Sequence, residues 1–288
     1  MSLTEEVCNS MEKRRMKPSA FLRRYGRIII AGTVLFLIVL VALFANKIAT
    51  HDPYAIDMYN AKIRPNEEHI MGTDIYGRDI FSRVVHGTRV SLLVSASVNI
   101  LSIIIGTIIG LLAGFYKKID KVIMRIMEGI SALPMILLAI VLVSVLGRGA
   151  INIIISITIV NLPGIARLVR SQVLSIKQIE YIESARAMGA SNLRIIFKYV
   201  LPQCLSPLII RFTNGLGSTI LTEASLSFLG AGLDPRIPSW GGIISEGKGL
   251  VMTHPYICAY PGFAIIITVL TFCILGDGVR DVLDPKLR

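Results

Sequence analysis

The chain has 288 residues, of which 53% are hydrophobic and only 17% are charged, and its mean hydropathy is +0.67. Soluble domains carry roughly 25% charged residues. The hydrophobic excess lies in long uncharged runs such as Val90–Tyr116 and Gly249–Gly276. This pattern excludes a soluble enzyme with one core, a disordered protein and a fibre. The net charge of +11 fits either a nucleic-acid-binding protein or a membrane protein with basic inner loops, so the positions of the charges decide.

Six segments are long and apolar enough to cross a bilayer, for which a helix needs about 20 mostly apolar residues. The third is expected to be entered from about Asp120, and the fifth is interrupted by Arg211 and Glu223. We therefore predict an all-α polytopic membrane protein with six transmembrane helices. The predicted spans are Ile28–Asn46, Val90–Tyr116, Ile130–Gly147, Gly149–Ala166, Leu201–Leu229 and Ile257–Gly276.

The first span has the position of a secretory signal peptide but not its length. Its leader is long and strongly charged, and its apolar run exceeds the 7–15 residues typical of a signal peptide. An uncleaved transmembrane helix is the favoured interpretation. The predicted organisation is a cytoplasmic segment at 1–27, a first transmembrane helix at 28–48, an outer loop with an amphipathic helix at 49–89, a core of five transmembrane helices at 90–276 that includes a long inner loop at 171–202, and a cytoplasmic tail at 277–288.

Lys and Arg gather on one predicted side of the membrane. With the N-terminus inside, 20 of the 30 basic residues lie in the N-terminal segment, the two inner loops and the tail. Cytoplasmic loops of membrane proteins carry such an excess, so we expect both termini in the cytoplasm. The same asymmetry explains the basic composition without nucleic acid, because no basic stripe is interleaved with stacking aromatic residues.

Small residues recur along one face of the second span, at steps of three and four that keep them on one side of a helix. In lipid, small faces let helices approach closely, so this face is an interface. Packing within the chain is the favoured interpretation, and a seam against a partner is the alternative. Pro134 and Pro163 lie inside or beside spans and predict kinks. The face comprises Ser91, Ser95, Asn99, Ser102, Gly106, Gly110 and Gly114.

The inner segment Ile176–Pro202 is too polar to cross the membrane and too helical in character to be a tether. Its apolar periodicity indicates one short helix that Gly189 stops and a second that Ser191 or Asn192 caps. We predict that this helical pair projects into the cytoplasm as a docking element.

The same segment contains Glu183-Ser184-Ala185, then Gly189, then Tyr199-Val200-Leu201-Pro202, between the fourth and fifth spans. This pattern resembles the EAA loop of ABC importer permeases, EAA-x3-G-x9-I-x-L-P, with Ser in place of the second residue and Tyr in place of Ile. The resemblance implies that the loop docks an ATPase subunit. The residues it places at that contact are Glu180, Glu183, Ser184, Ala185, Arg186, Ala187, Met188, Gly189 and Ala190.

Further segments resemble the C-type subunit of dipeptide, oligopeptide and nickel permeases. They are Gly72–Asp79 with Ser82-Arg83, Glu223–Gly230, Pro238–Gly241, Leu275–Asp281 and Leu283–Pro285. The resemblance implies a type I ABC importer permease in a bacterial inner or plasma membrane. It also implies four kinds of partner: a homologous B-type permease, two ATPase subunits, an extracytoplasmic binding protein and a peptide substrate, with lipid around the chain. A nickel or metal-chelate importer of the same family is the alternative.

One segment is a near miss to a nucleotide-binding loop. Gly242–Lys248 matches G-x4-G-K, but Gly249 replaces the Ser or Thr that binds magnesium, and no strand is predicted before it. We therefore expect no enzyme activity and no cofactor in this chain, with ATP hydrolysis on partner subunits. A channel or membrane anchor that needs no ATPase is a remote alternative, which the docking loop disfavours.

The fifth span carries the candidate translocation path. Arg211 lies about 13 Å along a helix from Pro202, and a charged residue at the centre of a membrane helix costs about 2.5–3.5 kcal/mol on insertion scales. We expect it to face a wet cavity or an anion, and an ion pair within the bundle is the alternative. The candidate path residues are Arg211, Asn214, Ser218, Thr222 and Glu223.

Reactive and metal-binding side chains do not cluster in the sequence. No disulfide, catalytic group or metal site is predicted. The scattered side chains are Cys8, Cys204, Cys258 and Cys273, at different depths, and His51, His69, His86 and His254, without ligand spacing.

The outer residues Thr50–Val90 mix charged and apolar positions, so we expect an interfacial amphipathic helix or a binding-protein docking surface.

Overall fold

The structure, a computed structural model, describes residues 18–283, with side chains described from residue 26 onward. The predicted terminal segments 1–27 and 277–288 therefore lie partly outside the described residues. Cys8 lies outside them. Within the described part of the chain the fold is helical, and strand pairing is limited to an isolated bridge between Thr73 and Asp79.

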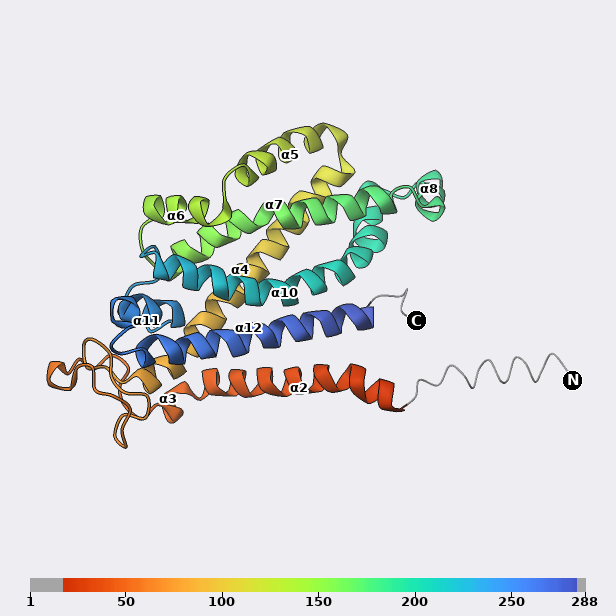
Figure 1. Cartoon of the computed structure of the whole chain (residues 1–288). Helices are drawn as coiled ribbons and strands as arrows, with labels where there is room; N and C mark the ends of the chain where they lie inside the picture. Colours follow the sequence, from red (N-terminus) through yellow and green to blue (C-terminus); the bar gives the residue numbers. More distant parts are fainter. Residues whose placement is uncertain (1–17, 284–288) are drawn as a thin grey trace, which may run out of the picture.

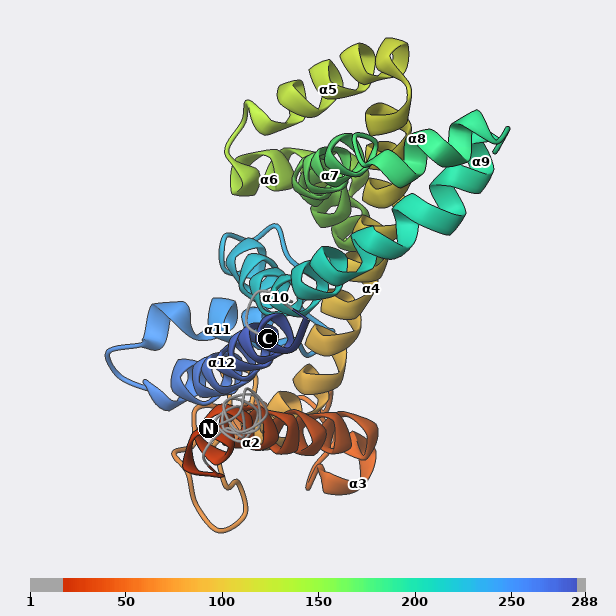
Figure 2. The ribbon, with the colours of Figure 1, turned by 90° about the vertical axis from the view of Figure 1, so that its right-hand side faces the viewer.

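Five helices in the described residues are long and apolar enough to cross a membrane. Four of them run beside one another, and α4 crosses them obliquely (Figure 1). Figure 2 shows the four foreshortened and arrayed one beside another along α4. The start of α2 and the end of α12 lie at one end of this bundle, which we call the α8 end, and the opposite end is the α11 end (Figure 1). The five are α2 (Pro18–Leu43), α4 (Ile80–Phe115), α7 (Ala150–Ile176), α10 (Leu201–Phe228) and α12 (Tyr256–Leu283).

The predicted third span is not one straight helix: it is broken next to Pro134, where the sequence predicts a kink. The chain forms α5 (Lys117–Ser131) and α6 (Met135–Leu146), which are bent by 93° relative to each other. Pro134 directly precedes α6, and a proline disfavours helical backbone in the residue before it. Because α6 is only about 18 Å long, it cannot cross the hydrocarbon core of about 30 Å alone. The pair therefore supplies a sixth crossing only as a broken span.

A bidentate ion pair holds the polar helix α5 against the bundle. Arg170 of α7 donates from Nε and Nη2 to the two carboxylate oxygens of Asp120, at 2.5 and 2.7 Å. Planar pairing of this kind fixes orientation as well as distance. Asp120 is thus a contact between helices rather than the entrance to a straight span.

The segment expected to form an interfacial amphipathic helix before the second span is continuous with that span. Residues 80–89 are the first turns of α4, and Ile80, Val84 and Val85 are buried inside the protein. At about 1.5 Å per residue the 36 residues of α4 are about 54 Å long, which exceeds the hydrocarbon core. The first turns of α4 therefore pack on protein.

Short helices complete the two ends. The α11 end carries α3 (Ala45–Ile48), the 3₁₀ turn η1 (Met58–Asn60), α11 (Trp240–Gly247) and the 3₁₀ turn η3 (Lys248–Leu250). The α8 end carries α8 (Glu180–Ala187), α9 (Asn192–Ile195) and the π-helical turn η2 (Ile196–Val200), which runs directly into α10.

The small-residue face of α4 packs within the chain, which confirms the favoured interpretation. A Cβ atom built on Gly106 would lie 2.7 Å from Ile165, and one on Gly114 would lie 2.6 Å from Val173, both on α7. Nearer the α11 end, the Ser95 hydroxyl donates to the Leu216 carbonyl at 2.7 Å. The face thus meets α7 along its inner half and α10 along its outer half.

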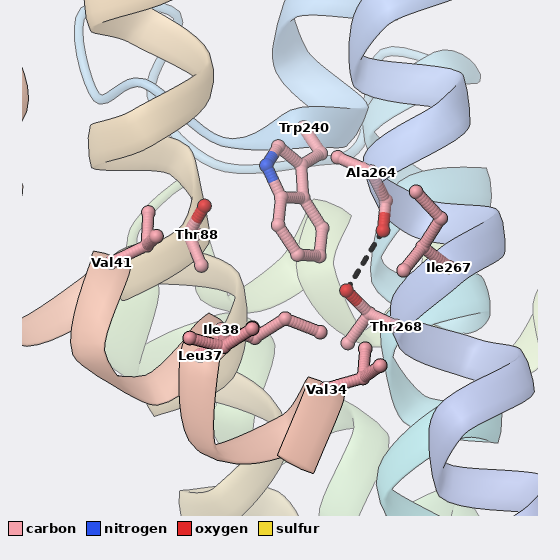
Figure 3. A pocket seen from close by; sticks show the side chains of 9 residues that line it. All are labelled: Val34, Leu37, Ile38, Val41, Thr88, Trp240, Ala264, Ile267 and Thr268. Carbon is pink, nitrogen blue, oxygen red and sulfur yellow. Dashed lines mark hydrogen bonds between the residues drawn. The ribbon is translucent and has the colours of Figure 1, made fainter. Parts of the chain in front are cut away.

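An apolar crevice of about 210 Å³ separates α2 from the rest of the bundle (Figure 3). Its two hydroxyls are satisfied by their own helices: Thr268 donates to the Ala264 carbonyl and Thr88 to the Val84 carbonyl. The donor of each hydroxyl is therefore used within its own helix, although its oxygen still has acceptor capacity. It is lined by Val34, Leu37, Ile38, Val41, Thr88, Trp240, Ala264, Ile267 and Thr268.

The close approach of α4 and α7 makes a testable prediction at Gly110. In Gly110→Ala the new Cβ would lie 2.6 Å from Cβ of Val169, so the helices must separate. Overpacking of this kind costs about 1–3 kcal/mol, and we expect a lower melting temperature of the purified protein in detergent. The matched control is Gly32→Ala in α2, where the new atom meets nothing within 4 Å. Equal melting temperatures for the two variants would contradict the packing argument.

Candidate functional site

The helix α8 lies at the extreme α8 end of the bundle, beyond the end of α7 (Figure 1). Its inward face is apolar, and Ile182 and Ala185 are buried. Ile182 belongs to one hydrophobic cluster with residues of α4, α7, α9, η2 and α10, among them Val173 and Ile195. The short helix is therefore rooted in a packed core, although eight residues form no stable helix alone.

Lys177, just after α7, ties the base of α8 to the end of α4. Its Nζ donates to the carbonyls of Gly114 and Phe115 at 3.2 and 3.1 Å and lies 5.0 Å from the centre of the Phe115 ring. Unpaired carbonyls at a helix C-terminus attract cations in this way. Burial lowers the pKa of Lys177, and the nearby positive charges of Arg186 and Lys117 lower it further.

The outward face of α8 carries most of the predicted docking residues. Met188 is 82% exposed, and the apolar side chains Leu193 and Phe197 beyond the turn are also exposed. Exposed apolar side chains among polar ones are typical of a protein-binding surface. Of the nine predicted residues, Ala185 is buried and Ala190 is half-buried, and the exposed ones are Glu180, Glu183, Ser184, Arg186, Ala187, Met188 and Gly189.

The turn after α8 is a Schellman motif. Gly189 adopts φ +84°, its N–H donates to the Arg186 carbonyl, and the N–H of Ala190 donates to the Ala185 carbonyl, both at 3.0 Å. Ser191 then caps α9 by accepting a hydrogen bond from the Arg194 N–H at 3.4 Å. The sequence correctly predicted the stop at Gly189 and, of its two candidate caps, Ser191 is the one that acts.

Three candidate path residues share an exposed face of α10. Arg211, Asn214 and Ser218 are spaced at three and four residues, which places them on one side of a helix, and all three are exposed. The Arg211 guanidinium also lies close to Gly164 of α7. An exposed arginine within a membrane span requires water, an anion or a partner, because lipid offers no compensation for its charge.

The other two candidate path residues are buried. Thr222 donates to the Ser218 carbonyl at 2.9 Å. Glu223 accepts hydrogen bonds from the hydroxyls of Ser227 and Ser239, at 2.8 and 3.3 Å. Ser239 is also the N-cap of α11, so Glu223 connects α10 to the start of α11.

A buried charge network joins the loop before α4 to α11. Arg78 donates to Asp74 at 2.7 Å and to Glu246 at 2.6 Å, and Arg83 donates to the same two carboxylates. Asp74 and Arg83 are almost fully buried. Two guanidinium groups and two carboxylates balance in charge, which burial of ionic groups requires. Three of its four residues, Asp74, Arg78 and Arg83, lie in the Gly72–Arg83 segment that resembles the C-type permeases.

Sequence reasoning missed two members of this end of the molecule. Glu246 had no visible role beyond the near miss to a nucleotide-binding loop, yet it completes the network. That segment forms α11 and the start of η3 rather than a loop. Trp240 is fully buried and donates from Nε1 to the Val84 carbonyl at 3.1 Å. Trp240 is the chain's only tryptophan and lies within Pro238–Gly241. This rarity was the feature of the sequence that could have pointed to its structural role.

These features define a class of protein: a polytopic helical membrane protein with a short helix, α8, packed firmly at one end of the bundle. The comparisons specify the class further. Residues 102–288 match the model of the family described as "Binding-protein-dependent transport system inner membrane component". The chain belongs to this family, and it is a permease subunit of an ABC importer, located in the inner membrane.

Several relatives cover most of the chain. It is 41% identical over 272 residues to the glutathione transport system permease protein GsiD of Pectobacterium atrosepticum, covering 93% of this chain and 89% of the relative. It is 41% identical over 265 residues to the dipeptide transport system permease protein DppC of Alkalihalophilus pseudofirmus, covering 91% and 87%. The Escherichia coli GsiD protein is 43% identical over 268 residues, covering 92% and 88%.

A solved structure supports the fold. The structure titled as an inward-facing conformation of the MetNI methionine ABC transporter superposes with a TM-score of 0.61 at 22% identity. The match covers 71% of this chain and 98% of that chain. At this identity the likeness concerns the fold alone, which is that of an ABC importer permease.

The left-handed turn at Gly189 generates a prediction. A non-glycine residue in this conformation costs about 1–2 kcal/mol, and asparagine tolerates it better than a β-branched residue. We expect transport activity to fall in the order wild type, Gly189→Asn, Gly189→Val, measured as substrate uptake. No neighbouring atom lies within 4 Å of the position, so an effect reflects backbone conformation and not a clash. Gly249→Ala, in an open site without positive φ, is the control, and equal activity of the Asn and Val variants would count against the motif.

Proposed function

We propose that this chain is the C-type permease subunit of an ATP-driven importer of peptides. In this proposal it forms half of the translocation path together with a homologous B-type permease. Two ATPase subunits dock at the α8 end, and an extracytoplasmic binding protein delivers the substrate at the opposite end. The observation that carries the proposal is the exposed docking face of α8 on a firmly rooted helix.

Peptides are the favoured substrates because of the names of the relatives. Proteins about 40% identical over nearly the whole chain are named as permeases for glutathione, dipeptides and peptides. The nickel and metal-chelate alternative has no such support among the relatives described above. Glutathione and dipeptides both carry free carboxylates, and the cationic face at Arg211 suits such a cargo.

The proposed orientation places α8 in the cytoplasm. Within the described part of the chain, the basic residues predicted to be inside lie on elements at this end, in agreement with the excess of Lys and Arg in cytoplasmic loops. Both described ends of the chain lie there as well (Figure 1). The loop before α4 and α11 then face the extracytoplasmic side, where a binding protein approaches.

Coupling in this proposal is mechanical. An ATPase that binds Glu183 and Met188 contacts α8, and the buried face of α8 belongs to one core with α4, α7 and α10. Packed interiors transmit displacement because they have little free volume. Movement of α8 is therefore expected to shift the cytoplasmic half of the bundle as a unit.

The docking face is tested with charge and polarity changes on exposed residues. We expect Glu183→Lys and Met188→Asp to reduce copurification of the ATPase subunits and substrate-stimulated ATP hydrolysis at least about tenfold, a loss of about 1.4 kcal/mol. Both side chains are exposed, so the permease should still fold. The matched control is Lys121→Glu, an exposed charge reversal on α5. Undiminished ATPase assembly in both α8 variants would refute the docking role.

The path face is tested at Arg211. We expect Arg211→Leu to lower uptake of a dipeptide at least about tenfold while the assembled complex remains intact, because a cationic group is removed from the polar face. Arg211→Lys should restore part of the activity. Ile209→Ala, an exposed position on another side of α10, is the control. Unchanged uptake and peptide-stimulated ATP hydrolysis in Arg211→Leu would exclude Arg211 from the path.

A further inference from the structure

Two histidines and an aspartate that are distant in sequence converge at the α11 end. Nδ1 of His69 lies 2.9 Å from Oδ1 of Asp79, and Nδ1 of His51 lies 4.0 Å from the same oxygen. The three potential ligand atoms all lie within 4.8 Å of one another. The two imidazole rings lie close together, with centroids 4.7 Å apart and planes tilted by 35°. His51 is partly exposed, whereas His69 and Asp79 are buried.

The backbone around this cluster is fixed by hydrogen bonds. The His51 N–H donates to the Ser82 hydroxyl at 3.0 Å, and the His69 N–H donates to the Asn66 side chain at 2.6 Å. Asp79 is the N-cap of α4: its Oδ2 accepts from the Ser82 N–H at 2.8 Å, which leaves Oδ1 directed at the histidines. The three side chains are therefore held in place from three separate segments.

The cavity beside the cluster is negatively charged. Its volume is about 180 Å³, and its lining contains four carboxylates and two imidazoles but no Lys or Arg. A surrounding of this kind attracts cations and disfavours anionic groups. The lining residues are His51, Asp52, Ala55, Asp57, Asn60, Glu68, His69, Gly77 and Asp79.

We propose that His51, His69 and Asp79 bind a divalent transition-metal ion, with Zn²⁺ as the reference ion. Two imidazoles and one carboxylate are a ligand set that first-row transition metals accept, whereas Ca²⁺ and Mg²⁺ prefer oxygen alone. Zn–N bonds of about 2.0–2.1 Å place tetrahedral ligand atoms about 3.3 Å apart. The two observed distances to Oδ1, 2.9 and 4.0 Å, bracket that separation. Since all three atoms lie within 4.8 Å of one another, no pair has to close by more than about 1.5 Å to complete the site.

The ion would act as a clamp on the extracytoplasmic loop. His51 follows α3, His69 lies in the loop and Asp79 begins α4, so one ion joins three points across 29 residues. A ligand that binds only the folded loop stabilises it by mass action. The inference is independent of the transported substrate, and it revises the expectation that the histidines hold no metal.

The experiment uses the transporter purified with its partner subunits in detergent and stripped with a chelator. Zinc binding is measured by calorimetric titration with ZnCl₂ and by elemental analysis after desalting. Two variants each remove one ligand: His51→Ala, and Asp79→Asn, which keeps a helix cap because asparagine is among the best N-cap residues. The matched control is His254→Ala, a histidine at the same end whose ring bonds only to Thr253 and packs against Tyr256.

We expect about one zinc ion per chain in the wild type and in the control, and binding at least about 100-fold weaker in both ligand variants. Zinc should also raise the melting temperature of the wild type but not of the variants, and this readout requires no transport. Tighter binding of another first-row ion at the same residues supports the site and identifies its ion. Absence of stoichiometric binding in the wild type, or equal binding in all four proteins, overturns the proposal while leaving the peptide-import assignment standing.

Discussion

The structure depends on the close approach of α4 and α7. Three glycines, Gly106, Gly110 and Gly114, remove the side-chain volume that would hold these helices apart, and Ile165, Val169 and Val173 fill the space. In lipid, water drives no hydrophobic association of helices, so packing of this kind supplies much of the attraction. The contact fixes the direction of α7, and the direction of α7 fixes the place of α8. Three glycines on one face of α4 thereby position the proposed docking surface.

The two ends of the bundle are stabilised by different kinds of interaction. At the α8 end an apolar core surrounds Ile182 and Ile195, and Lys177 caps the end of α4. At the α11 end the loop before α4 is held by the ion network of Asp74 and Arg83 and by the buried Trp240. Buried ionic groups add little net stability but penalise alternative arrangements strongly, since each unpaired charge is costly. The outer end is thus suited to hold one shape for a binding partner.

Hydropathy predicted most of the fold, because a membrane span is set by the length of an apolar run and little else. Pro134 predicted a kink between α5 and α6, but the size of the bend could not be predicted, since a proline is compatible with either a kinked helix or two separate ones and the bend depends on packing against α7. The outer turns of α4 carry an amphipathic pattern that fits a lipid interface as well as a protein contact. Contact with Trp240, more than 150 residues away, decides between them.

The candidate site was predictable to the extent that its pattern is local. The turn at Gly189 and the exposed face of α8 follow from spacing within one short segment. Glu223 shows where prediction from a local pattern fails. A charged side chain within a span is expected to line the path, yet Glu223 is bonded to the hydroxyl of Ser239, 16 residues later, which determines where its side chain lies. The same helix therefore carries two roles along its length. Its inner half exposes Arg211 and joins α8 through η2, whereas its outer half is bound to α11 through Glu223. A helix held at one end and connected to the docking element at the other is expected to pivot, which would move the Arg211 face while the outer end stays in place.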